Sequence, residues 1–162
     1  MYGVLPELYL FSEEDALKGF LTQTKDRTET SDQRVRPTIL VVDDQKLIAD
    51  TTAEVLNRCG FRTERAYNGD SALYIALQLR PDYLLTDIMM PGMNGVDLAI
   101  AIQNRLPRTL IVLLSGQAGI TDILRQARDD GYEFNLLAKP IHPEKLSEYL
   151  KSKAPHLWKQ GT

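Results

Sequence analysis

The chain has 162 residues, 43% of them hydrophobic, one cysteine (Cys59) and a formal net charge of −3. These values allow one domain with a sizeable core, give no reason to expect nucleic acid as a direct partner, and exclude an intrachain disulfide and a cysteine metal site. No apolar run is long enough to span a bilayer, so the composition predicts a protein of the reducing cytoplasm without membrane association.

Residues 1–36 lack the regular pattern of the rest of the chain. A secretory signal begins with a basic region, whereas this segment carries acidic residues instead, so it is not a secretory signal. Helical spacing of apolar residues predicts a short helix over about 13–22, and the charged stretch that follows is typical of a linker, which we expect to be mobile over 24–35. The segment is either a tail or a docking segment for a partner or for a second copy, which would give a homodimer.

From Pro37 onward, short apolar runs alternate with helical patterns. The runs predict strands at 38–42, 61–66, 82–86, 109–114 and 134–138. The helical patterns lie at 48–59, 72–79, 96–106, 120–130 and 143–150. Such alternation with short loops predicts an α/β fold with a five-stranded parallel sheet, right-handed crossovers and helices on both faces.

Polar residues stand at the ends of four of the predicted strands. They are Asp43 and Asp44, then Asp87, Ser115 and Lys139. In a parallel sheet these ends share one edge, where ligands bind. Three converging carboxylates repel one another, and a lysine or a hard divalent cation offsets this repulsion. A carboxylate beside Mg²⁺ can attack phosphorus, while a hydroxyl and an ammonium hold the phosphoryl oxygens.

Each of these residues also has an ordinary structural explanation. Helix capping accounts for Asp43 and Asp44, turn formation for Asp87 and Ser115, and a solvated surface position for Lys139. Together these explanations do not account for the fact that all the residues fall on one edge of the predicted sheet. The sequence therefore favours a functional site there.

The chain from about 37 to 152 resembles the receiver domain of bacterial two-component response regulators. The matching segments are Leu40-Val41-Val42-Asp43-Asp44, Asn68-Gly69, Asp87-Ile88-Met89-Met90-Pro91-Gly92-Met93-Asn94-Gly95, Leu114-Ser115-Gly116 and Lys139-Pro140. The resemblance implies a flavodoxin-like (βα)5 three-layer sandwich with strand order 2-1-3-4-5. It divides the chain into an N-terminal extension (1–36), a receiver domain (37–152) and a C-terminal tail (153–162).

The resemblance also implies a role for each site residue. Asp87 would be the phosphoacceptor and a ligand of Mg²⁺. Asp44 would bind the metal directly, Asp43 mostly through water, and Met89 through its backbone carbonyl. Ser115 would hydrogen-bond the phosphoryl group and Lys139 would pair with it.

The implied function is a phosphorylation-switched signalling module and not an enzyme in the usual sense, although it would catalyse its own phosphoryl transfer and dephosphorylation. The phosphoryl donor would be a histidine kinase or a histidine phosphotransfer protein. A downstream protein target, which the sequence does not name, would recognise a changed surface formed by residues 118–150. After Leu150 no output domain is visible, so the chain is either a single-domain regulator or part of a longer protein.

Receivers commonly carry Tyr or Phe three residues before the lysine, where this chain has Leu136, so that Leu136 is expected to respond to phosphorylation by repacking alone. The Lys139-Pro140 bond is expected to be cis, which costs only about 0.5–1 kcal/mol for an X–Pro bond. Trp158 in the tail is expected to be a loose surface anchor.

The sequence argues against two other function classes. A phosphohydrolase of the haloacid-dehalogenase type needs a second acid two residues after the nucleophile, whereas Asp87 is followed at that distance by Met89. A non-phosphorylated binding module on the receiver fold would predict the loss of an acidic or lysine position, and none is lost.

Overall fold

The computed structural model describes residues 35–116 and 120–159. The helix predicted over 13–22 and nearly all of the stretch expected to be mobile lie outside the described residues. None of the helices in the described ranges is long and apolar enough to cross a membrane.

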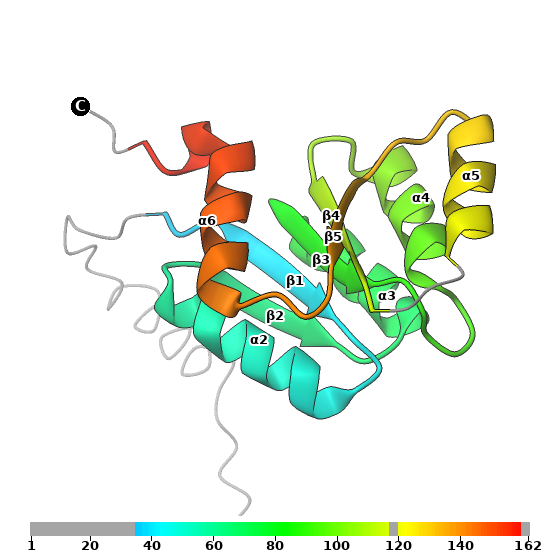
Figure 1. Cartoon of the computed structure of the whole chain (residues 1–162). Coiled ribbons are helices and arrows are strands. Elements are labelled where there is room, and N and C mark those ends of the chain that lie inside the picture. Colours follow the sequence, from blue (N-terminus) through cyan, green and yellow to red (C-terminus); the bar gives the residue numbers. More distant parts are fainter. Residues whose placement is uncertain (1–34, 117–119, 160–162) are drawn as a thin grey trace, which may run out of the picture. The chain divides into compact units, whose positions relative to one another are not determined.

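Strands and helices alternate along the described chain, as predicted (Figure 1). In order they are β1 (Thr38–Val42), α2 (Lys46–Arg58), β2 (Arg62–Ala66), α3 (Gly69–Leu79), β3 (Tyr83–Asp87), α4 (Gly95–Arg105), β4 (Leu110–Ser115), α5 (Thr121–Asp129), β5 (Asn135–Ala138), α6 (Pro143–Lys153) and the 3-10 turn η1 (Pro155–Leu157).

The five strands form one parallel sheet in the order β2-β1-β3-β4-β5. This confirms the predicted fold class and strand order. Helices α2 and α6 cover one face of the sheet, and α3, α4 and α5 cover the other (Figure 1).

The core consists of two layers because alternate residues of each inner strand point to opposite faces. Leu40, Leu84 and Leu113 belong to the cluster under α3, α4 and α5. Their neighbours Val41, Tyr83 and Val112 belong to the cluster under α2 and α6. Burial on both faces explains the continuous apolar runs in the sequence.

The predicted strand boundaries agree with the structure within one residue, and two of the differences concern the site. Asp87 and Ser115 are the last residues of β3 and β4, because Asp87 still pairs with Leu114, and Ser115 with Ala138, in the parallel register. The helix predicted over 48–59 ends at Arg58, with Cys59 as its C-cap, and the next residue, Gly60, has a positive φ of 104°.

The C-terminal segment is held more firmly than the loose surface anchor that the sequence suggested. The ring of Trp158 packs edge-on against Phe61, with ring centroids 4.7 Å apart. The ammonium of Lys151 lies 4.5 Å from the centroid of the Trp158 ring and donates a hydrogen bond of 2.7 Å to the carbonyl of Cys59. Sequence spacing gave no sign of these contacts because they join segments far apart in the chain.

Candidate functional site

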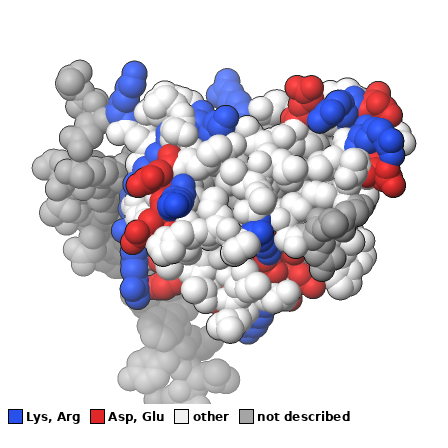
Figure 2. Space-filling view, viewed as in Figure 1, with Lys and Arg blue, Asp and Glu red and all other residues white. Residues whose placement is uncertain are grey.

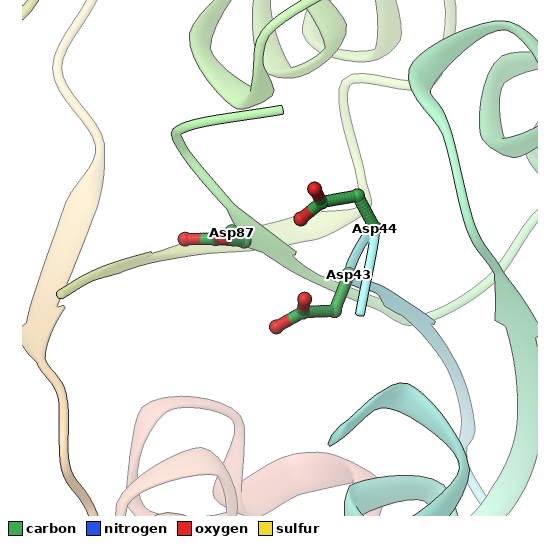
Figure 3. A group of neighbouring side chains, drawn as sticks. All are labelled: Asp43, Asp44 and Asp87. Atoms are coloured by element: carbon green, nitrogen blue, oxygen red, sulfur yellow. The ribbon is translucent and has the colours of Figure 1, made fainter. Parts of the chain in front are cut away.

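The residues predicted to share one edge of the sheet do come together at the carboxyl ends of the central strands. Asp43 and Asp44 directly follow β1, and Asp87 ends the neighbouring strand β3. Their three side chains point the same way in Figure 3. One carboxylate oxygen from each lies within 4.8 Å of the others. The fold therefore gathers three negative charges into one small volume.

The three carboxylates differ in exposure to solvent. The side chain of Asp43 is only 4% exposed, that of Asp87 is 13% exposed, and Asp44 is exposed. The Asp43 carboxylate accepts a hydrogen bond of 2.9 Å from the backbone N–H of Gln45, at the start of α2. This bond fixes the buried carboxylate and leaves Asp44 as the one that faces water.

Lys139 brings a cation to the same place from the end of the edge strand β5. Its ammonium lies 2.7 Å from Asp43 and 3.7 Å from Asp87. The lysine follows β5, and its backbone N–H donates a 2.7 Å hydrogen bond to the carbonyl of Ser115. The Lys139-Pro140 peptide bond is cis, as predicted.

The electrostatics of the site disfavour a charged Asp87. Burial raises the pKa of the Asp87 carboxyl above its ordinary value, the ammonium of Lys139 lowers it, and the charge of Asp43 raises it again. The net direction is upward, so Lys139 only partly offsets the loss of hydration and the repulsion. An additional cation beside Asp87 would favour the ionised, nucleophilic form.

The loop after Asp87 is held tightly to the end of β3. The backbone N–H of Gly95 donates a 2.8 Å hydrogen bond to the carbonyl of Ile88. A Cβ placed on Gly95 would lie 2.0 Å from the carbonyl oxygen of Asp87, so no larger residue fits here. Asn94 caps α4 by accepting a 2.9 Å hydrogen bond from the N–H of Asp97. Met89, within this loop, is 46% exposed.

One contact of this loop was missed at the level of sequence. Gly69, the first residue of α3, packs against Met93 of the loop after Asp87. A Cβ on Gly69 would meet the Met93 Cβ at 2.7 Å and its carbonyl oxygen at 2.9 Å. In the sequence, Asn68-Gly69 is only one of the segments that resemble the receiver family. Residue spacing carries no information about its contact with a segment farther along the chain.

Ser115 lies on the inner strand β4, and Leu136 lies on its neighbour β5, at the edge of the sheet. Ser115 ends β4 with a partly buried side chain, and a Cβ on the next residue, Gly116, would touch the Lys139 side chain at 3.6 Å. Leu136 is 44% exposed and lines a hollow of about 270 Å³ together with Leu124 and Phe134. The space beside Leu136 is therefore open to solvent.

The donor set fits a hard divalent cation. Three carboxylates supply oxygen ligands close together, and the exposed one, Asp44, leaves room for water. Mg²⁺ prefers one or two carboxylates, several waters and a phosphate oxygen. The acidic group can hold such a metal.

Comparison with known proteins agrees with this geometry. Residues 39–151 match the family model described as "Response regulator receiver domain". The DNA-binding response regulator MtrA of Mycobacterium tuberculosis is 33% identical over 114 residues, which cover 69% of this chain and 48% of MtrA. The autoinducer 1 sensor kinase/phosphatase LuxN of Vibrio harveyi is 37% identical over 83 residues, which cover 51% of this chain and 10% of LuxN.

Solved structures give the same result. The response regulator receiver domain protein (CheY-like) from Methanospirillum hungatei superposes with a TM-score of 0.68 at 26% identity, covering 78% of this chain and 99% of that one. A two component transcriptional regulator AraC from Clostridium phytofermentans gives 0.62 at 30% identity, covering 76% and 99%. The present chain spans about half the length of MtrA, so the match concerns the receiver part of that relative.

The family match and the strand order point to the same class of protein, whose general function is phosphorylation on an aspartate. The chain therefore belongs to the response regulator receiver domains, the phosphoacceptor signalling modules of two-component systems.

Proposed function

We propose that Asp87 is the residue of this receiver that accepts the phosphoryl group, in a reaction that depends on Mg²⁺. The observation that carries the proposal is the group of three carboxylate oxygens within 4.8 Å of one another, with the Lys139 ammonium at its side. Asp87 is the member of the group that ends the central strand β3. Its position supports the role of nucleophile, and the other two carboxylates suit the role of metal ligands.

In the proposed reaction an oxygen of Asp87 attacks the phosphorus of a phosphohistidine. A phosphorus–oxygen bond forms as the phosphorus–nitrogen bond breaks, and the electron pair of the broken bond stays with the imidazole. Mg²⁺, when bound, screens the charge of the incoming phosphoryl group. Asp44 would hold the metal directly, Asp43 mostly through water, and the backbone carbonyl of Met89 would complete the protein ligands.

Two further residues would bind the phosphoryl oxygens. Lys139 already lies 3.7 Å from Asp87 and would pair with a phosphoryl oxygen after transfer. Ser115 would donate a hydrogen bond to another oxygen from the end of β4. The same arrangement would admit a water molecule that attacks the phosphorus and returns Asp87 to its free form, so the module would also dephosphorylate itself.

The partners follow from the proposed chemistry. The donor would be a histidine kinase or a histidine phosphotransfer protein, in keeping with the similarity to the sensor kinase/phosphatase LuxN. The receiver would occupy residues 37–152, consistent with the match at 39–151, with 1–36 as an extension and 153–162 as a tail. A downstream protein would recognise the surface formed by residues 118–150, which is described from residue 120 onward.

The test is phosphorylation by a small acyl phosphate, followed by mass spectrometry of the intact protein. We expect one added phosphoryl group in the presence of Mg²⁺ and none in a chelator. Asp87→Asn should abolish the addition, whereas Asp70→Asn, a control that removes an exposed carboxylate of α3, should leave it unchanged. Labelling of Asp87→Asn, or labelling without a divalent metal, would contradict the assignment.

A further inference from the structure

A groove between α4 and α5 combines an apolar floor with an acidic rim. Its volume is about 360 Å³. The floor includes Val96 and Ile100 of α4 and Ile123 of α5. The rim carries the carboxylates of Asp97, Asp122 and Asp130, and no lysine or arginine lines the groove. The groove therefore presents three negative charges around an apolar surface.

The rim charges are only weakly engaged within the described part of the chain. Asp122 pairs with Arg125 of the same helix, but both side chains are largely exposed, so this pair contributes little. Asp130 accepts hydrogen bonds of 3.2 and 3.3 Å from the neutral amide of Gln126. For Asp97, the described residues offer no ion-pair partner. A positively charged partner would find all three carboxylates able to pair.

The two faces of α5 differ in charge. Its exposed side chains include Arg125 and Arg128 beside Asp122 and Asp129, and the charged cluster that is visible over α5 in Figure 2 contains both signs. Among the α5 residues that line the groove only Asp122 is charged, and its partner Arg125 lies outside the lining. A partner lying in the groove would therefore meet only negative charges on the lining residues.

The two helices that form the walls of the groove each begin after a loop at the edge of the sheet that carries the proposed phosphorylation site. Helix α4 begins after the loop that follows Asp87, and α5 begins after the loop that follows Ser115. Only Ala127 of α5 is fully buried, whereas α4 buries five of its residues. Few buried apolar contacts mean that α5 can shift at little cost, which would widen or narrow the groove.

We propose that the groove binds a cationic amphipathic segment of a partner protein, in which Lys or Arg side chains flank an aliphatic anchor. The aliphatic side chain would lie on Ile100 and Ile123, and the cations would pair with the rim carboxylates. Charge complementarity argues against the chain's own N-terminal segment as the occupant. Residues 1–22 carry one cation, Lys18, and the four carboxylates of Glu7, Glu13, Glu14 and Asp15. Like charges would repel that segment from the groove.

The regulatory half of the proposal rests on the proposed function. If phosphorylation of Asp87 moves α5, the affinity of the groove for the cationic segment changes with it. The recognition half does not depend on phosphorylation, and the two can be tested separately.

Recognition is tested with a synthetic amphipathic peptide of leucine and lysine, titrated into the ¹⁵N-labelled full-length protein and followed by NMR. We expect shifts concentrated on α4 and α5, and none with the counterpart in which glutamate replaces lysine. A triple variant, Asp97→Asn with Asp122→Asn and Asp130→Asn, should bind about tenfold more weakly. Each exposed ion pair strengthens binding by about 1.4-fold to fivefold, and the three contributions multiply.

A matched triple variant controls for net charge. Glu54→Gln, Glu64→Gln and Asp70→Asn remove the same number of exposed carboxylates outside the groove. This control should keep its affinity within about twofold, since distant exposed charges are screened by salt. Equal losses in the two triple variants would show nonspecific attraction and overturn the proposal. Shifts centred outside α4 and α5 would also overturn it. A dimer in solution that only the groove variant dissociates would overturn it as well, because a second copy of the chain would then cover the groove.

The regulatory half is tested by repeating the titration with beryllofluoride-loaded protein. We expect the dissociation constant to change by about threefold or more on loading, and Asp87→Asn, which should not load, to show no change. An unchanged constant in protein shown by mass spectrometry to accept phosphate on Asp87 would overturn this half alone. Failure of Asp87 to accept phosphate would instead count against the proposed function and leave recognition by the groove as measured.

Discussion

The indole N–H of Trp158 donates a hydrogen bond of 3.0 Å to the hydroxyl of Tyr83. Tyr83 begins β3, the strand that ends at Asp87, and its side chain is fully buried. Burial raises the pKa of the Tyr83 hydroxyl, which keeps it neutral. The C-terminal segment thus supplies the hydrogen-bond partner for a buried polar group at the end of the sheet opposite the carboxylates.

Loss of this hydrogen bond should destabilise the domain. Trp158→Phe keeps an aromatic ring against Phe61 but leaves the Tyr83 hydroxyl without its donor, so we expect the free energy of unfolding to fall by about 1–3 kcal/mol. The measurement is urea unfolding followed by circular dichroism. In the background of Tyr83→Phe the same change should cost less, because no hydroxyl is left unpaired. Tyr74→Phe, at a tyrosine that is 69% exposed, should change stability by no more than about 0.5 kcal/mol.

The raised pKa of Asp87 predicts that this residue costs stability in the metal-free protein. Because the folded state binds the proton more tightly than the unfolded state, stability falls as the pH rises from the ordinary carboxyl pKa through the raised one. Asp87→Asn should therefore unfold at a higher temperature than the parent protein at neutral pH in chelator. The difference should vanish at a pH below the ordinary pKa, where both forms are neutral. A variant that is less stable at neutral pH would contradict this account of the site.

Gly69 should matter for the site although it lies on a different element. Helix propensity alone would make Gly69→Ala stabilising by up to about 1 kcal/mol. The contact with Met93 opposes this gain, because the new Cβ would push the loop that carries Met89. We expect Mg²⁺ affinity, measured by calorimetry, and the rate of phosphorylation each to fall about tenfold, since small displacements of reacting groups are costly. Asp70→Ala, next to Gly69 in the same helical turn, should leave both unchanged.

Leu136 should limit the conformational response to phosphorylation. An aromatic side chain with a hydroxyl could exchange a surface hydrogen bond for burial, whereas Leu136 can only repack against neighbours such as Leu124 and Phe134. A modification shifts an equilibrium only by its different interaction with the two states, so the response should be modest. NMR of the free and beryllofluoride-loaded protein should show shifts spread over α5 and β5, and Leu136→Ala should reduce them. Shifts confined to the carboxylates and Lys139 would exclude the predicted output surface formed by residues 118–150.

A hollow adjoins Leu136 and is lined in part by aromatic side chains. In the view of Figure 2 the charged side chains gather toward the edges, and the middle of this face is largely uncharged. Tyr132 and Phe134 stack beside the hollow next to Leu136, with their rings 8° from parallel. These side chains belong to the stretch 118–150, which is predicted to form the output surface.

The sequence by itself determined the fold class, the strand order through the family resemblance, and the set of polar residues at the strand ends. Apolar runs such as 38–42 and 109–114 are local patterns, and local patterns specify strands that are buried on both faces. Asp43, Asp87 and Lys139 could be assigned to one edge because parallel strands place all their carboxyl ends there.

Only the tertiary structure decided which of these groups contact one another and how strongly. It placed the Lys139 ammonium closer to Asp43 than to Asp87, packed Met93 against Gly69, and brought Trp158 to Tyr83. These contacts join segments far apart in the chain, and their distances depend on how side chains fill the space between packed layers. Periodicity and spacing report the direction of a side chain along its own element, and they carry no information about the partner that packing brings to it.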